Sequence, residues 1–287
     1  MATREKNKRS QDEKLVQLFL ETRARNLHEI VILPAIKIVM KKIVSMLENK
    51  KNLGKVINGT LNGIEISVIS SLMGCPNMAI IVESLKRCRT KVIIRVDICG
   101  GIEVEENSVS IGDILIPNLA YCGDGTCPQY IAKHSDNLQQ LRSITNPNPK
   151  ISRIKSGNQN VYLSEPDEQL KMLLYNYGES LYPEKIKKVD FWTTDAIFCE
   201  NDDFITALRS IGVQGIDMEN SILFLLGRLY NIKTASILSV SDLPGNETGD
   251  FSKEKYLFQD LNKGIDDTLT ILCNSLPKIS LMINDVA

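Results

Sequence analysis

The sequence predicts a single α/β domain with a central mixed β-sheet and helices on both faces. Segments of strand composition alternate with segments of helical periodicity through most of the chain. The 287 residues, 43% of them hydrophobic, are enough to bury a large core. No internal repeat interrupts the alternation. We assign residues 1–12, which are charged and polar, to a flexible basic tail, and residues 13–287 to the domain.

In the N-terminal half, predicted strands alternate with predicted helices, and two of the strands are joined by a hairpin. Asn62-Gly63 lies between two alternating segments, which is a strong signal for a two-residue hairpin. Pro76 suits the first position of a helix. The elements predicted here are a helix over about 15–25, a strand Ile30–Leu33, a helix over 36–47, strands over 55–60 and 65–70, a helix from 76 to about 88, and a strand over 91–96.

The C-terminal half continues the alternation after a long irregular stretch. Residues 121–150 are rich in Gly, Pro, Asn and Ser and are predicted to form long loops. The other elements predicted here are a strand over 112–117, a helix over 166–177, a strand over 187–192, helices over 202–211 and 221–230, a strand over 234–240, a turn over 245–249 and a closing helix over 254–276.

Composition excludes several classes of function. A net charge of −1 gives no sign of binding to nucleic acid or to a membrane surface, and no run of about 18 apolar residues predicts a membrane span. The seven cysteines contain no C-x-x-C pair, so free thiols in a reducing, cytoplasmic compartment are expected. Cys122 and Cys127 have no second pair or nearby histidine to complete a zinc site, and only two histidines exist. We therefore predict no metal.

The candidate site is the unit over 215–245. Asp217 and Glu219 precede its helix, and Asp242 follows its strand. Ligands of open α/β sheets usually bind at strand ends, so a pocket is expected around these three carboxylates. Two plainer interpretations exist: acidic residues favour a helix N-terminus, and Asp242 before Pro244 suits a turn.

Six motifs, which occur in the same order along the chain, resemble the nucleoside phosphorylase family. This is the family of the hexameric purine nucleoside phosphorylases and the uridine phosphorylases. The resemblance extends from about residue 28 to residue 277 and implies that family's fold. The motifs are Gly74-Cys75-Pro76-Asn77, the strand at 91–95 followed by Cys99-Gly100-Gly101, Gly112-Asp113-Ile114, Thr194-Asp195-Ala196-Ile197-Phe198, the segment 215–219, and Ser241-Asp242.

The resemblance implies roles for individual residues. Glu219 is expected to bind the ribose hydroxyls, with Met218 against the sugar, and Asp242 after Ser241 is expected to protonate purine N7, which requires a raised pKa. Lys255 is the nearest candidate to assist that aspartate, although Lys253 is also close. The remaining substrate-binding candidates are Ile197 and Phe198 at the base and Arg95 at the phosphate.

The base is predicted to be a purine. In the uridine enzymes a glutamine and an arginine follow the segment that matches Ile197-Phe198, and here those positions fall on Asn201 and Asp203. Those enzymes also lack an acid at the position of Asp242.

The phosphate elements depart from the family pattern. Glycine, acid and arginine are replaced by Ala35, Ile36 and Val39, and the family's Gly-Ser or Gly-Thr step after Arg95 is replaced by Asp97-Ile98. Asp97 is expected to neutralise Arg95, and Lys37 or Lys41 could compensate for the lost arginine.

Two functions therefore remain open. The first is a pentosyltransferase of purine salvage, which cleaves the N-glycosidic bond of a purine nucleoside to free base and ribose 1-phosphate. It needs no cofactor beyond phosphate as co-substrate, and a hydrolytic nucleosidase is a variant of it. The second is a degenerate homologue that binds a nucleoside or nucleotide without turnover. By resemblance, we expect a homo-oligomer, either a dimer or a trimer of dimers, with sites shared between subunits.

Overall fold

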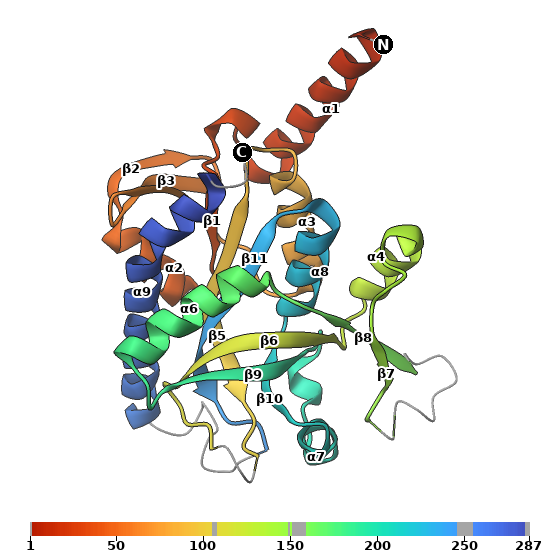
Figure 1. Ribbon diagram of the computed structural model, residues 1–287, viewed down its shortest axis with the longest axis vertical. Coiled ribbons are helices and arrows are strands. Elements are labelled where there is room, and N and C mark those ends of the chain that lie inside the picture. The colour runs from red at the N-terminus through yellow and green to blue at the C-terminus, as the bar shows by residue number, and fades with distance from the viewer. Residues whose placement is uncertain (1, 105–107, 149, 151–158, 246–254, 285–287) are drawn as a thin grey trace.

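The computed structural model describes residues 2–104, 108–148, 150, 159–245 and 255–284 and confirms the predicted α/β class (Figure 1). Its main sheet is mixed, in the order β2-β3-β4-β1-β5-β10-β9-β6-β8-β7, and β11 pairs with both β5 and β6. The strands are β1 (Ile30–Leu33), β2 (Glu48–Leu53), β3 (Val56–Leu61), β4 (Ile64–Ile69), β5 (Val92–Gly101), β6 (Ile114–Cys122), β7 (Ser143–Thr145), β8 (Asn160–Ser164), β9 (Ile186–Thr193), β10 (Val213–Asp217) and β11 (Lys233–Asp242).

Five of these strands close into a ring. β11 runs parallel to β5 and antiparallel to β6, β6 and β10 both run parallel to β9, and β10 returns antiparallel to β5. The last step pairs Gly215 with Gly101 and Ile216 with Gly100. The ends of β5, β10 and β11 therefore meet at one place.

Glycine is required where β5 and β10 meet. A Cβ on Gly100 would lie 2.6 Å from the Cγ2 atom of Ile216, and one on Gly215 would lie 2.4 Å from the ring of Phe191. Both distances are shorter than side chains tolerate, so larger residues would separate the two strands. The strand predicted over 91–96 is therefore longer than expected, because Gly100 and Gly101 continue β5 into this contact.

Helices cover both faces of the sheet, as predicted. One apolar core lies under α2, α6 and α9, a second lies under α1, α3, α4 and α8, and a third, smaller one includes the buried side of α7. The helices are α1 (Ala2–Leu20), α2 (Lys37–Met46), α3 (Cys75–Leu85), α4 (Cys127–Lys133), α6 (Glu168–Leu181), α7 (Asp202–Ser210), α8 (Asn220–Tyr230) and α9 (Lys255–Asn284), with short 3-10 turns η1 (Ala24–Asn26), η2 (Ser135–Asn137) and η3 (Ile197–Cys199).

Strand β5 separates the first two cores because its side chains alternate. Val92, Ile94 and Val96 belong to the core under α9, whereas Ile93 and Cys99 belong to the core under α8. Arg95 and Asp97 share the parity of Ile93 and Cys99. The two charged residues of β5 therefore point toward the α8 side.

The predicted hairpin is confirmed, and the predicted loop over 121–150 is wrong in part. Asn62 and Gly63 have φ of 48° and 78°, the left-handed values that a two-residue hairpin needs. Residues 121–150 contain α4, η2 and β7 as well as loops. Strands β2, β8 and β10 were not predicted. β2 reads ENKKNL and is almost entirely exposed, so it has no apolar face to signal a strand.

Three further predictions concern the N-terminal tail, the turn over 245–249 and membrane spans. Residues 2–12 continue α1, which projects from the body of the molecule (Figure 1), and the boundary between tail and domain at residue 13 stays a prediction. Of the predicted turn over 245–249, only Gly245 lies within the described residues. Among the described helices, none is long and apolar enough to cross a membrane.

Candidate functional site

A cavity of about 110 Å³ lies where β5, β10 and β11 meet. Its lining also includes Ala35 and Ile36 in the loop after β1, Met73 just before α3, and Ile197 of η3. Six of the predicted site residues line this cavity: Arg95, Ile197, Met218, Glu219, Ser241 and Asp242. Residues more than 140 positions apart in the sequence thus contribute to one pocket.

Arg95 is the centre of the polar end of this cavity. It is 2% exposed and surrounded by three carboxylates. Its Nη1 lies 2.8 Å from Asp217 Oδ2, and its Nη2 lies 2.5 Å from Glu219 Oε2 and 3.6 Å from Asp97 Oδ2. Of the described residues that line the cavity, Arg95 is the one cation. Asp97, Asp217 and Glu219 therefore all pair with the one positive charge of Arg95. The sequence predicted that Asp97 would neutralise Arg95, and the structure adds two further carboxylates.

Burial competes with these contacts in setting the pKa values. Burial alone would lower the pKa of Arg95, but the charges of Glu219, Asp217 and Asp97 raise it by more than burial lowers it. The net pKa lies above the ordinary value of arginine, so the guanidinium stays charged. Burial and the neighbouring Asp217 and Asp97 charges raise the pKa of Glu219 to about 7, against the opposing effects of Arg95 and the Gly74 N–H. Glu219 therefore titrates near neutral pH.

Glu219 is held in one orientation by the chain. Its Oε1 accepts a 2.7 Å hydrogen bond from the backbone N–H of Gly74, which precedes α3 with φ 96°, and Arg95 donates to its Oε2. An ionised carboxylate has about four acceptor positions, so two of them remain for other donors. Asp217 fixes the start of α8 by accepting from the N–H groups of Glu219 and Asn220. The acidic motif thus combines helix capping by Asp217 with a positioned carboxylate at Glu219.

Asp97 makes contacts that the sequence did not suggest. Its Oδ2 accepts from the N–H of Ala35 at 2.8 Å, and its Oδ1 accepts from the N–H of Ile36 at 3.3 Å. Burial raises the pKa of Asp97, and Arg95 and these amides oppose that rise. The carboxylate of Asp97, which belongs to β5, therefore lies against the segment that follows β1. That segment, around Ala35 and Ile36, has no acidic residue of its own. Lys37 and Lys41 are exposed and do not line the cavity.

The other end of the cavity carries two further carboxyl groups. Asp242 is the last residue of β11. Ser241 Oγ lies 2.5 Å from Asp242 Oδ1 and 3.0 Å from the carbonyl oxygen of Cys99, and its single hydrogen is donated to one of these two acceptors at a time. Glu200 lines the same end, and burial together with Asp242 raises its pKa to about 8. Glu200 was missed in the sequence, although it follows the Thr194–Phe198 motif by two residues.

Two predicted site residues are not among the described residues that line the cavity. Phe198 is fully exposed, at 101%, and does not line the cavity of a single chain. Lys255 begins α9, and its side chain, like all of Lys253, lies outside the described residues. Asn201 caps α7 and Asp203 pairs with Lys150, so neither contributes to the cavity.

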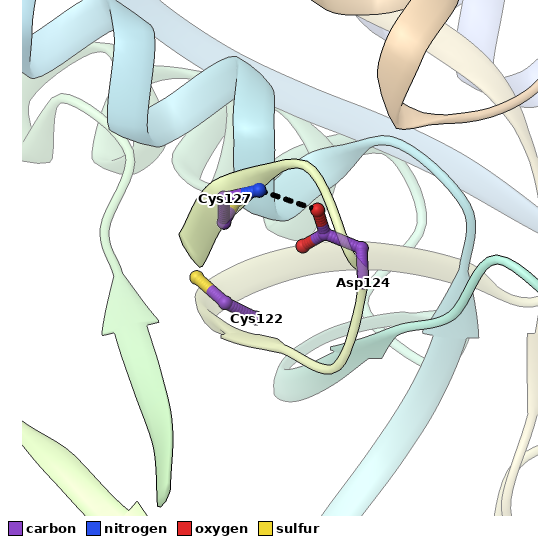
Figure 2. A group of neighbouring side chains, drawn as sticks. All are labelled: Cys122, Asp124 and Cys127. Atoms are coloured by element: carbon purple, nitrogen blue, oxygen red, sulfur yellow. Dashed lines mark hydrogen bonds between the residues drawn. The ribbon is translucent and has the colours of Figure 1, made fainter. Parts of the chain in front are cut away.

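A cluster of two thiols and a carboxylate lies beside α8. Figure 2 shows Cys122, Asp124 and Cys127, whose ligand atoms all lie within 4.8 Å of one another, a spacing that could hold a metal ion. However, Asp124 Oδ1 accepts from the N–H groups of Thr126 and Cys127, and its Oδ2 accepts from Ser221 Oγ. Burial also raises the pKa of Cys127, which disfavours a thiolate ligand. These contacts give Asp124 a structural role, linking the start of α4 to α8.

Comparison with known proteins identifies the class. The model of the phosphorylase superfamily matches residues 29–267, and the chain belongs to that family. It is 22% identical to a guanosine phosphorylase of Halorubrum lacusprofundi over 231 residues, which cover 78% of this chain and 83% of the relative. It is 28% identical to a DeoD-type purine nucleoside phosphorylase of Limosilactobacillus reuteri over 239 residues, covering 80% and 89%.

The fold has close counterparts among solved structures. A uridine phosphorylase from Vibrio fischeri superposes with a TM-score of 0.68 at 21% identity, covering 88% of this chain and 93% of that one. This likeness establishes the nucleoside phosphorylase fold that the sequence motifs predicted.

Proposed function

We propose that this chain binds a purine nucleoside in the cavity and cleaves its N-glycosidic bond. The observation that carries the proposal is the pairing of two carboxyl groups in one pocket. Glu219, oriented by Gly74 and Arg95, is at one end, and Asp242, bound by Ser241, is at the other. A nucleoside offers ribose hydroxyls to the first and a base nitrogen to the second.

The two groups suit the two charges of the reaction. Cleavage of a glycosidic bond develops positive charge on the sugar ring, and a carboxylate bonded to the ribose hydroxyls stabilises that charge. The departing base gains negative charge, which a proton from Asp242 to N7 would neutralise. Glu200, with a pKa raised to about 8, is a nearby carboxyl group that stays protonated at neutral pH and keeps negative charge away from the base.

The base end supports a purine rather than a pyrimidine. Asn201 and Asp203, at the positions expected to read uracil, are used in a helix cap and a surface ion pair. An acid at Asp242 has a use on purine N7 and none on uracil. The two curated relatives above are named as guanosine and purine nucleoside phosphorylases.

The surface at the cavity mouth supports a homo-oligomer, a dimer or a trimer of dimers. Met73 and Ile197 line the cavity and are at least half exposed, and so are their chain neighbours Leu72 and Phe198. The cavity of about 110 Å³ is below the roughly 300–1,000 Å³ of sites for drug-sized ligands. A second copy over this mouth would cover the apolar residues and complete the base end.

A cytoplasmic role in purine salvage agrees with the thiol chemistry. All seven cysteines, each within the described residues, are free thiols. Free thiols are typical of reducing compartments.

A binding protein without turnover is the second candidate. The observation that favours it is Asp97, which takes the backbone amides of Ala35 and Ile36 and lies beside Arg95. A phosphate ion would find these donors already used, so phosphorolysis would be weak or absent. A nucleoside could then bind at Glu219 without an acceptor to react with.

A nucleoside panel tests the proposal. The purified protein is incubated with inosine, guanosine, adenosine and uridine, with and without phosphate, and free base is measured by chromatography. We expect base from at least one purine nucleoside and none from uridine. The Asp242→Asn variant, purified in the same way, controls for contaminating enzymes. Saturable nucleoside binding with no free base under either condition would favour the binding protein.

A further inference from the structure

The chain contains a built anion site that one of its own carboxylates fills. Ala35 and Ile36 immediately precede α2, a helix of 10 residues. Their backbone N–H groups and the guanidinium of Arg95 all contact the carboxylate of Asp97. Free N–H groups at a helix N-terminus, next to an arginine, form a binding site for anions. The carboxylate of Asp97 occupies it.

Asp97 is fixed at this position by its surroundings. It is 1% exposed, it bonds the two amides at 2.8 and 3.3 Å, and it lies 3.6 Å from Arg95. An external anion would have to displace Asp97 from the amides. It would then meet the carboxylates of Asp97, Asp217 and Glu219 with Arg95 as the one cation among the described lining residues. The site is therefore closed to phosphate by charge and by occupancy.

The same carboxylate lines the cavity and keeps acceptor capacity. Its two oxygens accept from the N–H groups of Ala35 and Ile36, and the N–H of Ile98 also bonds this carboxylate. A carboxylate has about four acceptor positions, so about one remains facing the cavity. A water molecule at this end of the cavity would donate to Asp97 and present its oxygen toward the sugar held by Glu219. The pocket thus offers a base for water where the anion site would otherwise bind phosphate.

We propose that Asp97 makes this protein a nucleoside hydrolase, with water as the acceptor and Asp97 as its general base. This inference rests on the proposed function and deepens it. The water oxygen forms a bond to C1′ of the ribose as its proton passes to Asp97. The C1′–N bond breaks, its electron pair goes to the base, and Asp242 delivers a proton to N7. The products are free base and ribose, and solvent returns one proton from Asp97 to Asp242.

The test measures which acceptor is used. The parent protein is given the purine nucleoside that it cleaves, in phosphate-free buffer and at up to 50 mM phosphate, and both ribose and ribose 1-phosphate are quantified. We expect free base and an equal amount of ribose at a rate that phosphate does not raise. Free base that appears only with phosphate, together with ribose 1-phosphate, overturns this inference and leaves the proposed function intact. No free base under any condition overturns both.

Variants of Asp97 distinguish a general base from a residue that only stabilises the structure. Asp97→Asn keeps the size of the side chain but cannot accept a proton, so base release should fall by about 10²-fold or more. Nucleoside affinity and the melting temperature are measured in parallel. Asp190→Asn, which alters a half-buried aspartate bonded to Asn118 away from the cavity, is the matched control and should keep the parent rate. An unchanged rate in Asp97→Asn overturns the role of Asp97.

A gain of phosphate use gives an independent readout. The double variant Asp97→Gly with Ile98→Ser frees the two amides, removes a negative charge and adds a hydroxyl donor. Titration with inorganic phosphate should show saturable binding in this variant and none in the parent. Tight phosphate binding by the parent would contradict the proposal, whether or not either variant folds.

Discussion

The two ends of the cavity are organised in different ways. At the sugar end, Arg95 is almost fully buried and pairs with Asp217, Glu219 and Asp97, and backbone N–H groups complete these contacts. At the base end, Asp242 and Glu200 are only partly buried, and the neighbouring Ile197 is half exposed. One end is a closed network within the chain, and the other is an open pocket.

The difference indicates which parts of the site exist before substrate arrives. A closed network costs folding energy but holds its groups in position, which is how enzymes stabilise developing charge without reorganisation. An open end leaves room for different bases and for a second subunit. Substitutions at the sugar end should therefore affect folding and binding together, whereas those at the base end should affect the reaction and its pH dependence.

The largest effect is expected at Arg95. Arg95→Ala leaves three buried carboxylates without their cation, and breaking a buried ion pair costs about 3–5 kcal/mol of unfolding free energy. Urea unfolding measures this loss, and nucleoside binding should disappear as well. Arg142→Ala is the control: its pair with Glu165 is well exposed, so a change below about 1 kcal/mol is expected. Equal losses in the two variants would contradict the closed network.

The next effect is expected at Asp242, and it should appear in the rate. Asp242→Asn keeps the shape but removes the proton, so cleavage of inosine or adenosine should fall by about 10²–10⁴-fold with little change in melting temperature. A nucleoside with a base that leaves readily without protonation should lose far less. Equal losses on both substrates would mean that Asp242 acts through structure.

A smaller effect is expected for ribose recognition. Glu219→Gln weakens a charge-assisted hydrogen bond of about 1.5–3 kcal/mol, so affinity for a purine ribonucleoside should fall by roughly 10–100-fold by calorimetry. A nucleoside without the ribose hydroxyls should lose less. Because Glu219 is 2% exposed and paired with Arg95, this variant should also lose some stability, unlike a simple helix cap. Unchanged affinity for both ligands would remove Glu219 from the sugar site.

The smallest effect is expected in the pH dependence of stability. The pKa of Glu200 is raised to about 8, so the folded chain holds a proton that the unfolded chain releases near pH 4.5. This contribution to stability is complete below about pH 4.5 and is lost as pH rises toward 8. Glu200→Gln should therefore reduce the fall in melting temperature between pH 5 and 8.5 by about 2 °C or more. A parallel fall in both proteins would contradict the raised pKa.

The sequence predicted the fold better than it predicted the contacts within the site. Strand β1 is a continuous apolar run, and β11 is rich in apolar and β-branched residues, so composition alone located both. The order of motifs located Glu219 and Asp242 in one pocket. The exposed β2 and the short β7 and β8 lack that signal. The contact of Asp97 with Ala35 joins residues 62 positions apart, and it depends on the parallel pairing of β1 with β5, which no local pattern specifies.

A crystal structure of the protein with a purine nucleoside that it cannot cleave tests the central claim most directly. The account predicts the ribose hydroxyls within about 3.2 Å of the Glu219 carboxylate, N7 of the base toward Asp242, and the sugar C1′ facing Asp97. A nucleoside bound outside this cavity, or bound in it with the base at Arg95 and the ribose at Asp242, would contradict the account.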